Sequence, residues 1–217
     1  MRLILYSRFD RSMTILKATK TNIEKAAQTV KEGGLVVYPT ETVYGLGCDP
    51  LNAKAITRLL EVKGERNKPL PILAASIANA EKVAFVSPNG KKLAEKFWPG
   101  SLTMVFPKKP VLPDVVTFGL DSVGLRIPDN GVALDLVRLS GGLLVGSSAN
   151  RTGEAPPREV QKLSGELKAM VDVVLDGGAT AHGMPSTVAD LTQETPRILR
   201  EGPVSLKELL AALALGD

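Results

Sequence analysis

Short apolar runs alternate with amphipathic segments along most of this chain of 217 residues. The runs are rich in β-branched and aliphatic residues, as in 70–75, 102–106 and 171–175, which predicts buried strands. Between them, apolar residues recur three or four positions apart, which predicts amphipathic helices. Strands that alternate with helices favour an α/β fold with parallel strand pairs. Short strand-to-strand connections late in the chain add antiparallel pairs, so we expect a mixed sheet.

Several motifs typical of helix N-termini occur along the chain, but no segment has the composition of an interdomain linker. Thr21 with Glu24 and Ser205 with Glu208 match the capping-box pattern, and Asn52 is an N-cap candidate. No Ser/Gly-rich or charge-rich linker interrupts the chain, so residues 1–217 are predicted to form a single domain. Further predicted elements are strands over 2–6, 13–16, 35–38, 123–127, 143–145, 187–191 and 197–200, and helices over 88–97, 132–139 and 158–163.

Polar side chains follow the predicted strand at 35–38. Pro39 ends its ladder, and Gly45 and Gly47 allow close approach of the backbone to another group. Two threonines, a glutamate and a tyrosine lie between Pro39 and Gly45, and such groups need partners in the protein or in a ligand. Open α/β sheets bind ligands beyond their strand ends, but hydroxyl-rich segments also serve as turns, so both interpretations stay open. A second hydroxyl-rich strand end follows at 146–150.

Composition excludes several classes of protein. The longest apolar runs are far shorter than a membrane span requires, and the N-terminal residues do not resemble a secretory signal, so a cytoplasmic protein is expected. The single cysteine, Cys48, and the single histidine, His182, exclude an internal disulfide and a Cys/His zinc site. A net charge of +4 allows anionic ligands, but the 27 basic residues are scattered and only 4% of residues are aromatic, which favours an ordinary solvated surface over a base-stacking face.

Cations in three places suggest phosphate or carboxylate recognition. Lys63, Arg66 and Lys68 crowd one predicted loop, where they either complement a helix C-terminus or clamp phosphates. Arg126 lies on an apolar strand, so we expect a carboxylate partner from the protein or from a substrate. Arg200 closes another strand, and Lys63 and Arg200 are both expected to be solvated charges at element ends.

Several ordered motifs resemble the YrdC-like family, whose members are L-threonylcarbamoyladenylate synthases. The resemblance covers roughly residues 20–205 and implies a twisted, largely open mixed α/β sheet with flanking helices and a concave basic groove. The motifs are YPTETVYGLG at 38–47, KGERNKPL at 63–70, WPGSLT at 98–103, VGLRIP at 123–128, SSAN at 147–150, PSTV at 185–188 and ILREG at 198–202.

The resemblance also implies a reaction. Family members condense L-threonine, bicarbonate or CO2, and ATP with Mg2+ into threonylcarbamoyl-AMP and pyrophosphate, a nucleotidyltransferase reaction. Other enzymes then transfer the threonylcarbamoyl group to tRNA next to the anticodon. Binding of tRNA or double-stranded RNA by the basic groove is an associated expectation. No protein metal site is implied.

Matching positions imply roles for individual residues. Thr40, Arg126, Gly146 and Ser186 would contact L-threonine. Lys63 and Arg66 would act on the phosphates, although Arg66 stands one position later than the family's Lys-x-Arg spacing allows, which leaves its contact open. The residues that would contact ATP are Lys63, Arg66, Ser122, Ser148, Asn150 and Arg200.

Two other functions remain open. A module that binds RNA without turnover would show salt-dependent RNA affinity and no response to threonine. A related carbamoyl-transfer domain would instead activate carbamoyl phosphate.

Overall fold

The computed structural model describes residues 13–65, 68–181 and 183–214. The strand expected at 2–6, as well as Arg66 and His182, lie outside the described residues. The strands are β1 (Thr14–Lys17), β2 (Val36–Tyr38), β3 (Gly45–Gly47), β4 (Ile72–Ala74), β5 (Leu102–Pro107), β6 (Ser122–Arg126), β7 (Leu143–Val145), β8 (Ser147–Ser148), β9 (Val173–Asp176), β10 (Thr187–Asp190) and β11 (Arg197–Arg200). The helices are α1 (Lys20–Lys31), α2 (Ala53–Lys63), α3 (Ile77–Ala80), α4 (Pro88–Phe97), α5 (Asp114–Thr117), α6 (Gly131–Leu139), α7 (Gly165–Met170) and α8 (Leu206–Ala214), with a 3-10 turn at Val160–Lys162.

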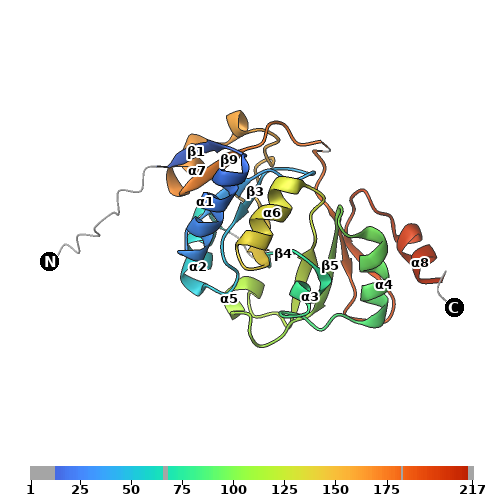
Figure 1. Ribbon diagram of the computed structural model, residues 1–217. Helices are drawn as coiled ribbons and strands as arrows, with labels where there is room; N and C mark the ends of the chain where they lie inside the picture. The colour runs from blue at the N-terminus through green and yellow to red at the C-terminus, as the bar shows by residue number, and fades with distance from the viewer. Residues whose placement is uncertain (1–12, 66–67, 182, 215–217) are drawn as a thin grey trace.

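The predicted mixed α/β architecture is confirmed. Within the described residues the strands form two hydrogen-bonded sheets, in the orders β1-β9-β2-β3-β8 and β11-β10-β5-β6-β4-β7. Both sheets are mixed: β2 is parallel to β9 and antiparallel to β3, and β10 is parallel to β5 and antiparallel to β11. In Figure 1 the first sheet lies at the left beside α1 and α2, and the second extends to the right toward α4 and α8.

Gly146 lies at one of the places where the chain passes between the two sheets. It separates β7, in the second sheet, from β8, in the first. Its N–H donates to the Pro71 carbonyl at 2.8 Å, and a Cβ at this position would lie 2.8 Å from Cγ of Leu73. A side chain here would therefore collide with Leu73 of β4, which favours the glycine.

Two apolar clusters hold the sheets and helices together. The larger cluster spans both sheets and includes Leu46, Ile72 and Val145. The smaller one lies beneath α1 and α6, which pack against each other, and includes Val30 and Leu136. Burial on this scale provides most of the free energy that favours folding. Among the helices of the described ranges, none has both the length and the apolar character that a membrane span needs.

Some predicted boundaries were wrong for local reasons. The N-cap of α1 is Thr19, whose hydroxyl accepts from the N–H of Asn22, so Thr21 lies inside the helix instead of capping it. The predicted helix over 158–163 is only a short 3-10 turn, because Ser164 caps a separate helix, α7, by accepting from the N–H of Leu167 at 3.1 Å. The predicted cap Asn52 is confirmed, and Ser76 and Ser87 cap α3 and α4 in the same way.

Candidate functional site

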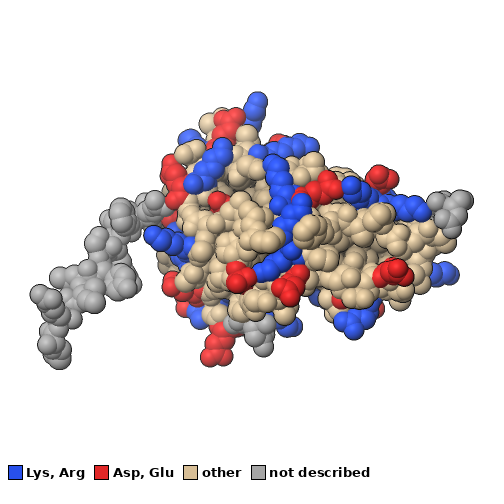
Figure 2. Space-filling view, turned by 90° about the horizontal axis from the view of Figure 1, so that it is seen from below, with Lys and Arg blue, Asp and Glu red and all other residues tan. Residues whose placement is uncertain are grey.

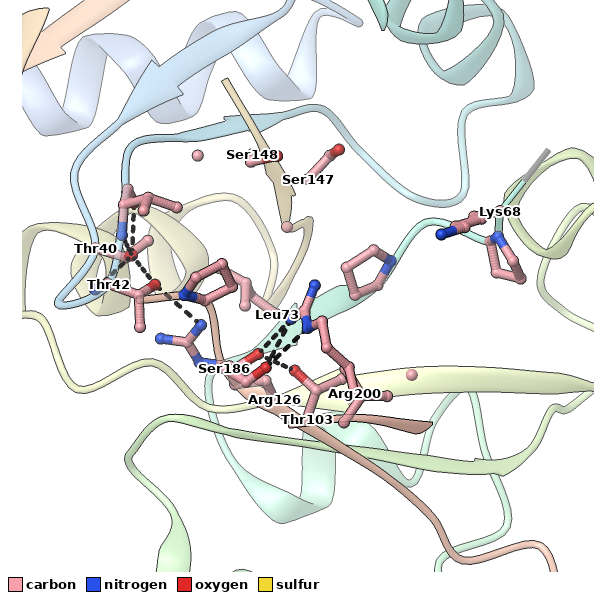
Figure 3. Close-up of a pocket in the computed structure, with 18 of the residues that line it drawn as sticks. Thr40, Thr42, Lys68, Leu73, Thr103, Arg126, Ser147, Ser148, Ser186 and Arg200 are labelled. Atoms are coloured by element: carbon pink, nitrogen blue, oxygen red, sulfur yellow. Dashed lines mark hydrogen bonds between the residues drawn. The ribbon is translucent and has the colours of Figure 1, made fainter. Parts of the chain in front are cut away.

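A pocket of about 540 Å³ is lined by residues of both sheets. Gly45 and Ser148 come from the first sheet, whereas Thr103 and Gly124 come from the second. A volume of this size suits a ligand as large as a nucleotide. Figure 3 shows polar side chains from several strand ends converging on it.

The lining is cationic. Lys68, Arg126 and Arg200 contribute to it, and the part of the lining that the structure describes contains no Asp or Glu side chain. Figure 2 shows Lys and Arg side chains in a band across the middle of one face, between the region of the first sheet and that of α4 and α8. A cavity lined by positive charges and surrounded by protein of low dielectric constant concentrates the electric field, so it attracts anions strongly.

Arg126, the last residue of β6, is held by the protein on two sides. Its Nε donates to the Gly100 carbonyl at 2.9 Å, and its Nη2 forms an ion pair with Oε1 of Glu41. Its Nη1 lies 3.4 Å from Oγ1 of Thr42 (Figure 3). Both Arg126 and Glu41 are only 6% exposed. The carboxylate partner expected for Arg126 is thus supplied by the protein, yet Arg126 still lines the pocket.

The two threonines of the β2–β3 loop play different parts. The hydroxyl of Thr40 accepts from the N–H groups of Thr42 and Val43 and lies 2.7 Å from the Val43 carbonyl, so it stabilises the turn. Thr42, which the sequence did not single out, places its hydroxyl between Thr40 Oγ1 at 2.9 Å and Arg126. Both threonines line the pocket.

Ser186 and Arg200 form a second polar cluster on the opposite side. Nε and Nη2 of Arg200 donate to the Ser186 carbonyl at 3.0 and 2.8 Å, and the Ser186 hydroxyl lies 2.8 Å from Oγ1 of Thr103. Burial, and then the charge of Arg126, lower the pKa of Arg200 below its ordinary value. Two arginines close enough to repel one another favour a bound anion between them.

Lys63, at the end of α2, is not the solvated charge that we expected. It is 1% exposed, and its Nζ donates to the Ser148 carbonyl at 2.7 Å and to the carbonyl of Asn150. The side-chain amide of Asn150 donates to the carbonyls of Arg151 and Glu154. Lys63 therefore fixes the segment that carries Ser148 from behind, and neither Lys63 nor Asn150 belongs to the described lining.

The structure brings together most of the site predicted from the sequence. Arg66 lies outside the described residues. The sequence did not single out Thr42, Leu73 or Thr103, although Thr42 and Thr103 lie within the motifs that drew attention to their neighbours. The predicted residues that line the pocket are Thr40, Ser122, Arg126, Gly146, Ser148, Ser186 and Arg200.

Comparison with known proteins gives a consistent family match. The model of the Sua5/YciO/YrdC family, described as telomere recombination, matches residues 28–202. A threonylcarbamoyl-AMP synthase of Pyrococcus abyssi is 40% identical over 91% of this chain and 60% of its own length. One from Bacillus subtilis is 35% identical over 91% of this chain and 58% of its own.

A solved structure agrees with these relatives. It is the crystal structure of P. abyssi Sua5 complexed with L-threonine, which has a TM-score of 0.86 and 38% identity over 93% of this chain and 60% of that one. The chain thus spans about 60% of the length of these relatives.

Proposed function

Because the chain belongs to the Sua5/YciO/YrdC family, we propose that it is an L-threonylcarbamoyladenylate synthase. It condenses L-threonine, bicarbonate or CO2, and ATP into threonylcarbamoyl-AMP and pyrophosphate, and is thus a nucleotidyltransferase. The product serves threonylcarbamoyladenosine modification of tRNA next to the anticodon, through downstream transfer enzymes.

The cationic pocket is the observation that carries this proposal. Its described walls combine Lys68, Arg126 and Arg200 with several hydroxyls and no carboxylate, a lining suited to a polyphosphate beside an amino acid carboxylate. The relatives named above as threonylcarbamoyl-AMP synthases, and the relative solved with L-threonine, support the choice of ligands.

The pocket divides into two proposed subsites. Arg126, Thr42 and Ser186 surround the threonine subsite, next to the turn that Thr40 stabilises and the backbone of Gly146. Ser122, Ser148, Lys68 and Arg200 face the space proposed for ATP. Arg66 is proposed to join the phosphate contacts, while Lys63 and Asn150 act indirectly by holding the segment that carries Ser148.

The proposed chemistry needs positioning and charge neutralisation rather than a protein nucleophile. The threonine amine adds to CO2 to give a carbamate. A carbamate oxygen then attacks the α-phosphate, and pyrophosphate leaves. Mg2+ is expected to enter on ATP and to be held mainly by phosphate oxygens, because the described lining offers hydroxyls but no carboxylate. Cations directed at the phosphates stabilise the charge that develops there, an effect that can reach a few kcal/mol.

An omission experiment tests the proposal. Pyrophosphate release is measured with the complete mixture, and then without threonine, without bicarbonate, and with carbamoyl phosphate in place of both. We expect release only in the complete mixture. Release that needs neither threonine nor bicarbonate would disprove the synthase, and release with carbamoyl phosphate would indicate a carbamoyl-transfer domain. RNA affinity that falls with salt, in the absence of any pyrophosphate release, would indicate a binding module.

A further inference from the structure

Glu41 lies between two threonines that line the pocket, but its own side chain does not. Thr40 and Thr42 belong to the lining, whereas the carboxylate of Glu41 is 6% exposed and contacts Arg126 from behind. This arrangement separates the groups that a ligand can touch from a charged group that acts on them.

The hydrogen bonds of this carboxylate are incomplete. Oε1 forms the ion pair with Nη2 of Arg126 and lies 3.4 Å from the Ser101 hydroxyl. Oε2 is buried and has no hydrogen-bond partner among the described residues. A buried ion pair with an unsatisfied oxygen adds little to stability, because desolvation offsets the attraction. Folding alone therefore does not explain the pair.

The contacts of Arg126 suggest what Glu41 does. A guanidinium is planar, so fixing Nε through the Gly100 carbonyl and Nη2 through Glu41 also fixes the direction of Nη1. Nη1 makes only the long contact with Thr42 at 3.4 Å among the described residues, and it keeps donor capacity for a ligand. In Figure 3 the guanidinium of Arg126 lies beside Thr42, on the side of Ser186.

Charge balance gives the same answer. Arg126 and Arg200 are close enough for the charge of one to act on the other. Glu41 already compensates the charge of Arg126, whereas Arg200 faces the space proposed for ATP, so the threonine subsite has little positive charge to spare for a second carboxylate.

We propose that Glu41 is a positioning residue that directs Nη1 of Arg126 at the α-carboxylate of the substrate and restricts this subsite to one negative charge. The inference rests on the proposed function, since threonine is the amino acid invoked, and it deepens that function by assigning the charge selectivity of the site.

The test compares Glu41→Gln with the wild-type protein. Asp135→Asn is the matched control, because it removes a carboxylate from an exposed pair with Arg138 on α6. Arginine side-chain NMR, with the Arg126 signals assigned by their loss in Arg126→Lys, reports whether the guanidinium is held. Calorimetry measures the affinities for L-threonine, L-aspartate and a non-hydrolysable ATP analogue.

We expect Glu41→Gln to let the Nη groups of Arg126 rotate freely and to weaken threonine binding about tenfold. Loss of a residue that orients a ligand-binding group costs about 10- to 100-fold in affinity at metal sites, and the lower value is expected here. Affinity for L-aspartate relative to L-threonine should rise, and affinity for the ATP analogue should not change. The control should match the wild type in every measurement. Glu41→Asp keeps the charge but withdraws the carboxylate, so it should fold and show the same changes in NMR and in threonine affinity to a smaller degree.

The outcomes separate the two proposals. Unchanged Arg126 signals with unchanged threonine affinity would overturn the role of Glu41. Equal losses of threonine and ATP-analogue affinity in both variants, together with lower melting temperatures, would also overturn it, because the pair would then be structural. A wild-type protein that binds no threonine would disprove the proposed function, while freed Arg126 signals in Glu41→Gln would still support the positioning role.

Discussion

Lys63 shows how the environment of a side chain decides what its charge does. Its ammonium group is buried and bonded to the carbonyls of Ser148 and Asn150, so it organises one wall of the pocket from outside. Position in the chain, at the end of a helix, suggested a solvated charge. Only the packing of α2 against a segment some 85 residues away shows otherwise.

Lys63→Met should therefore lower both stability and ATP affinity. The variant leaves buried carbonyls without their donor, which costs about 1–3 kcal/mol for each such group, and loosens the segment of Ser148. Urea denaturation and calorimetry with an ATP analogue measure the two effects. Lys54→Met, on an exposed position of the same helix, is the control and should change stability by no more than about 0.5 kcal/mol. Normal stability in Lys63→Met would show that the buried hydrogen bonds contribute nothing.

Arg126→Lys should remove threonine recognition selectively. Lysine keeps a positive charge opposite Glu41 but cannot reproduce the planar arrangement that contacts Gly100, Glu41 and the ligand at once. Loss of one charge-assisted hydrogen bond, about 1.5–3 kcal/mol, corresponds to a roughly 10- to 150-fold weaker threonine affinity. Calorimetry should show this loss with ATP-analogue affinity retained, whereas wild-type threonine affinity would remove Arg126 from the site.

At the scale of single residues, the sequence predicted which side chains take part in the site better than it predicted where those side chains point. Arg126 could be selected as a charged residue on an apolar strand and Ser186 through the family resemblance, and both line the pocket. The direction of Lys63, away from the pocket, could not be predicted, because it depends on contacts with residues distant in the chain.

At the scale of elements, local signals predicted helices well and very short strands poorly. Asn52, Ser76 and Ser87 cap their helices because the hydroxyl or amide satisfies a free N–H within three residues. In contrast, β3 and β8 consist of glycines, leucine and serines, which have no strong strand preference. β3 is a strand because it pairs with β2 on one side and β8 on the other, and β8 is a strand because it pairs with β3.

Gly47 in β3 lies close against β7 of the other sheet, and this contact can be measured. A Cβ at Gly47 would lie 2.5 Å from the Val145 carbonyl and 2.9 Å from Cγ of Leu144. Gly47→Ala should thus force β3 away from β7 and destabilise the protein by about 1–3 kcal/mol, as overpacking does. Gly131→Ala is the control, since a Cβ there meets no atom within 4 Å. An unchanged urea midpoint in Gly47→Ala would mean that the strands can separate without cost.

At the scale of the whole molecule, the division of strands between two sheets was beyond the sequence. Alternation of strands and helices predicts a mixed sheet, and the structure confirms mixed pairing. It does not reveal which strands become neighbours, because β1 and β2 both pair with β9, which lies far along the chain. The pocket is lined by residues of both sheets, and Gly146, at one of the crossings between them, is among those residues.

Ligands that bind this pocket should stabilise both sheets together. At about 100 times its dissociation constant, threonine or an ATP analogue should each add about 2.7 kcal/mol to the free energy of unfolding. Hydrogen exchange should slow at β3 and β8 in one sheet and at β5 and β6 in the other, since each pair contributes to the lining. Slower exchange confined to a single sheet would show that the ligands do not connect them.

The order of the strands also has a consequence for synthesis of the protein. Thr40 and Thr42 are made early, whereas Ser186 and Arg200, on the other side of the pocket, are made near the end. A nascent chain therefore lacks one side of its binding site until late in translation, and β2 also lacks its partner strand β9 until then. Threonine and ATP therefore cannot stabilise the early folding intermediates on the ribosome. They bind only chains that have already been synthesised through Arg200.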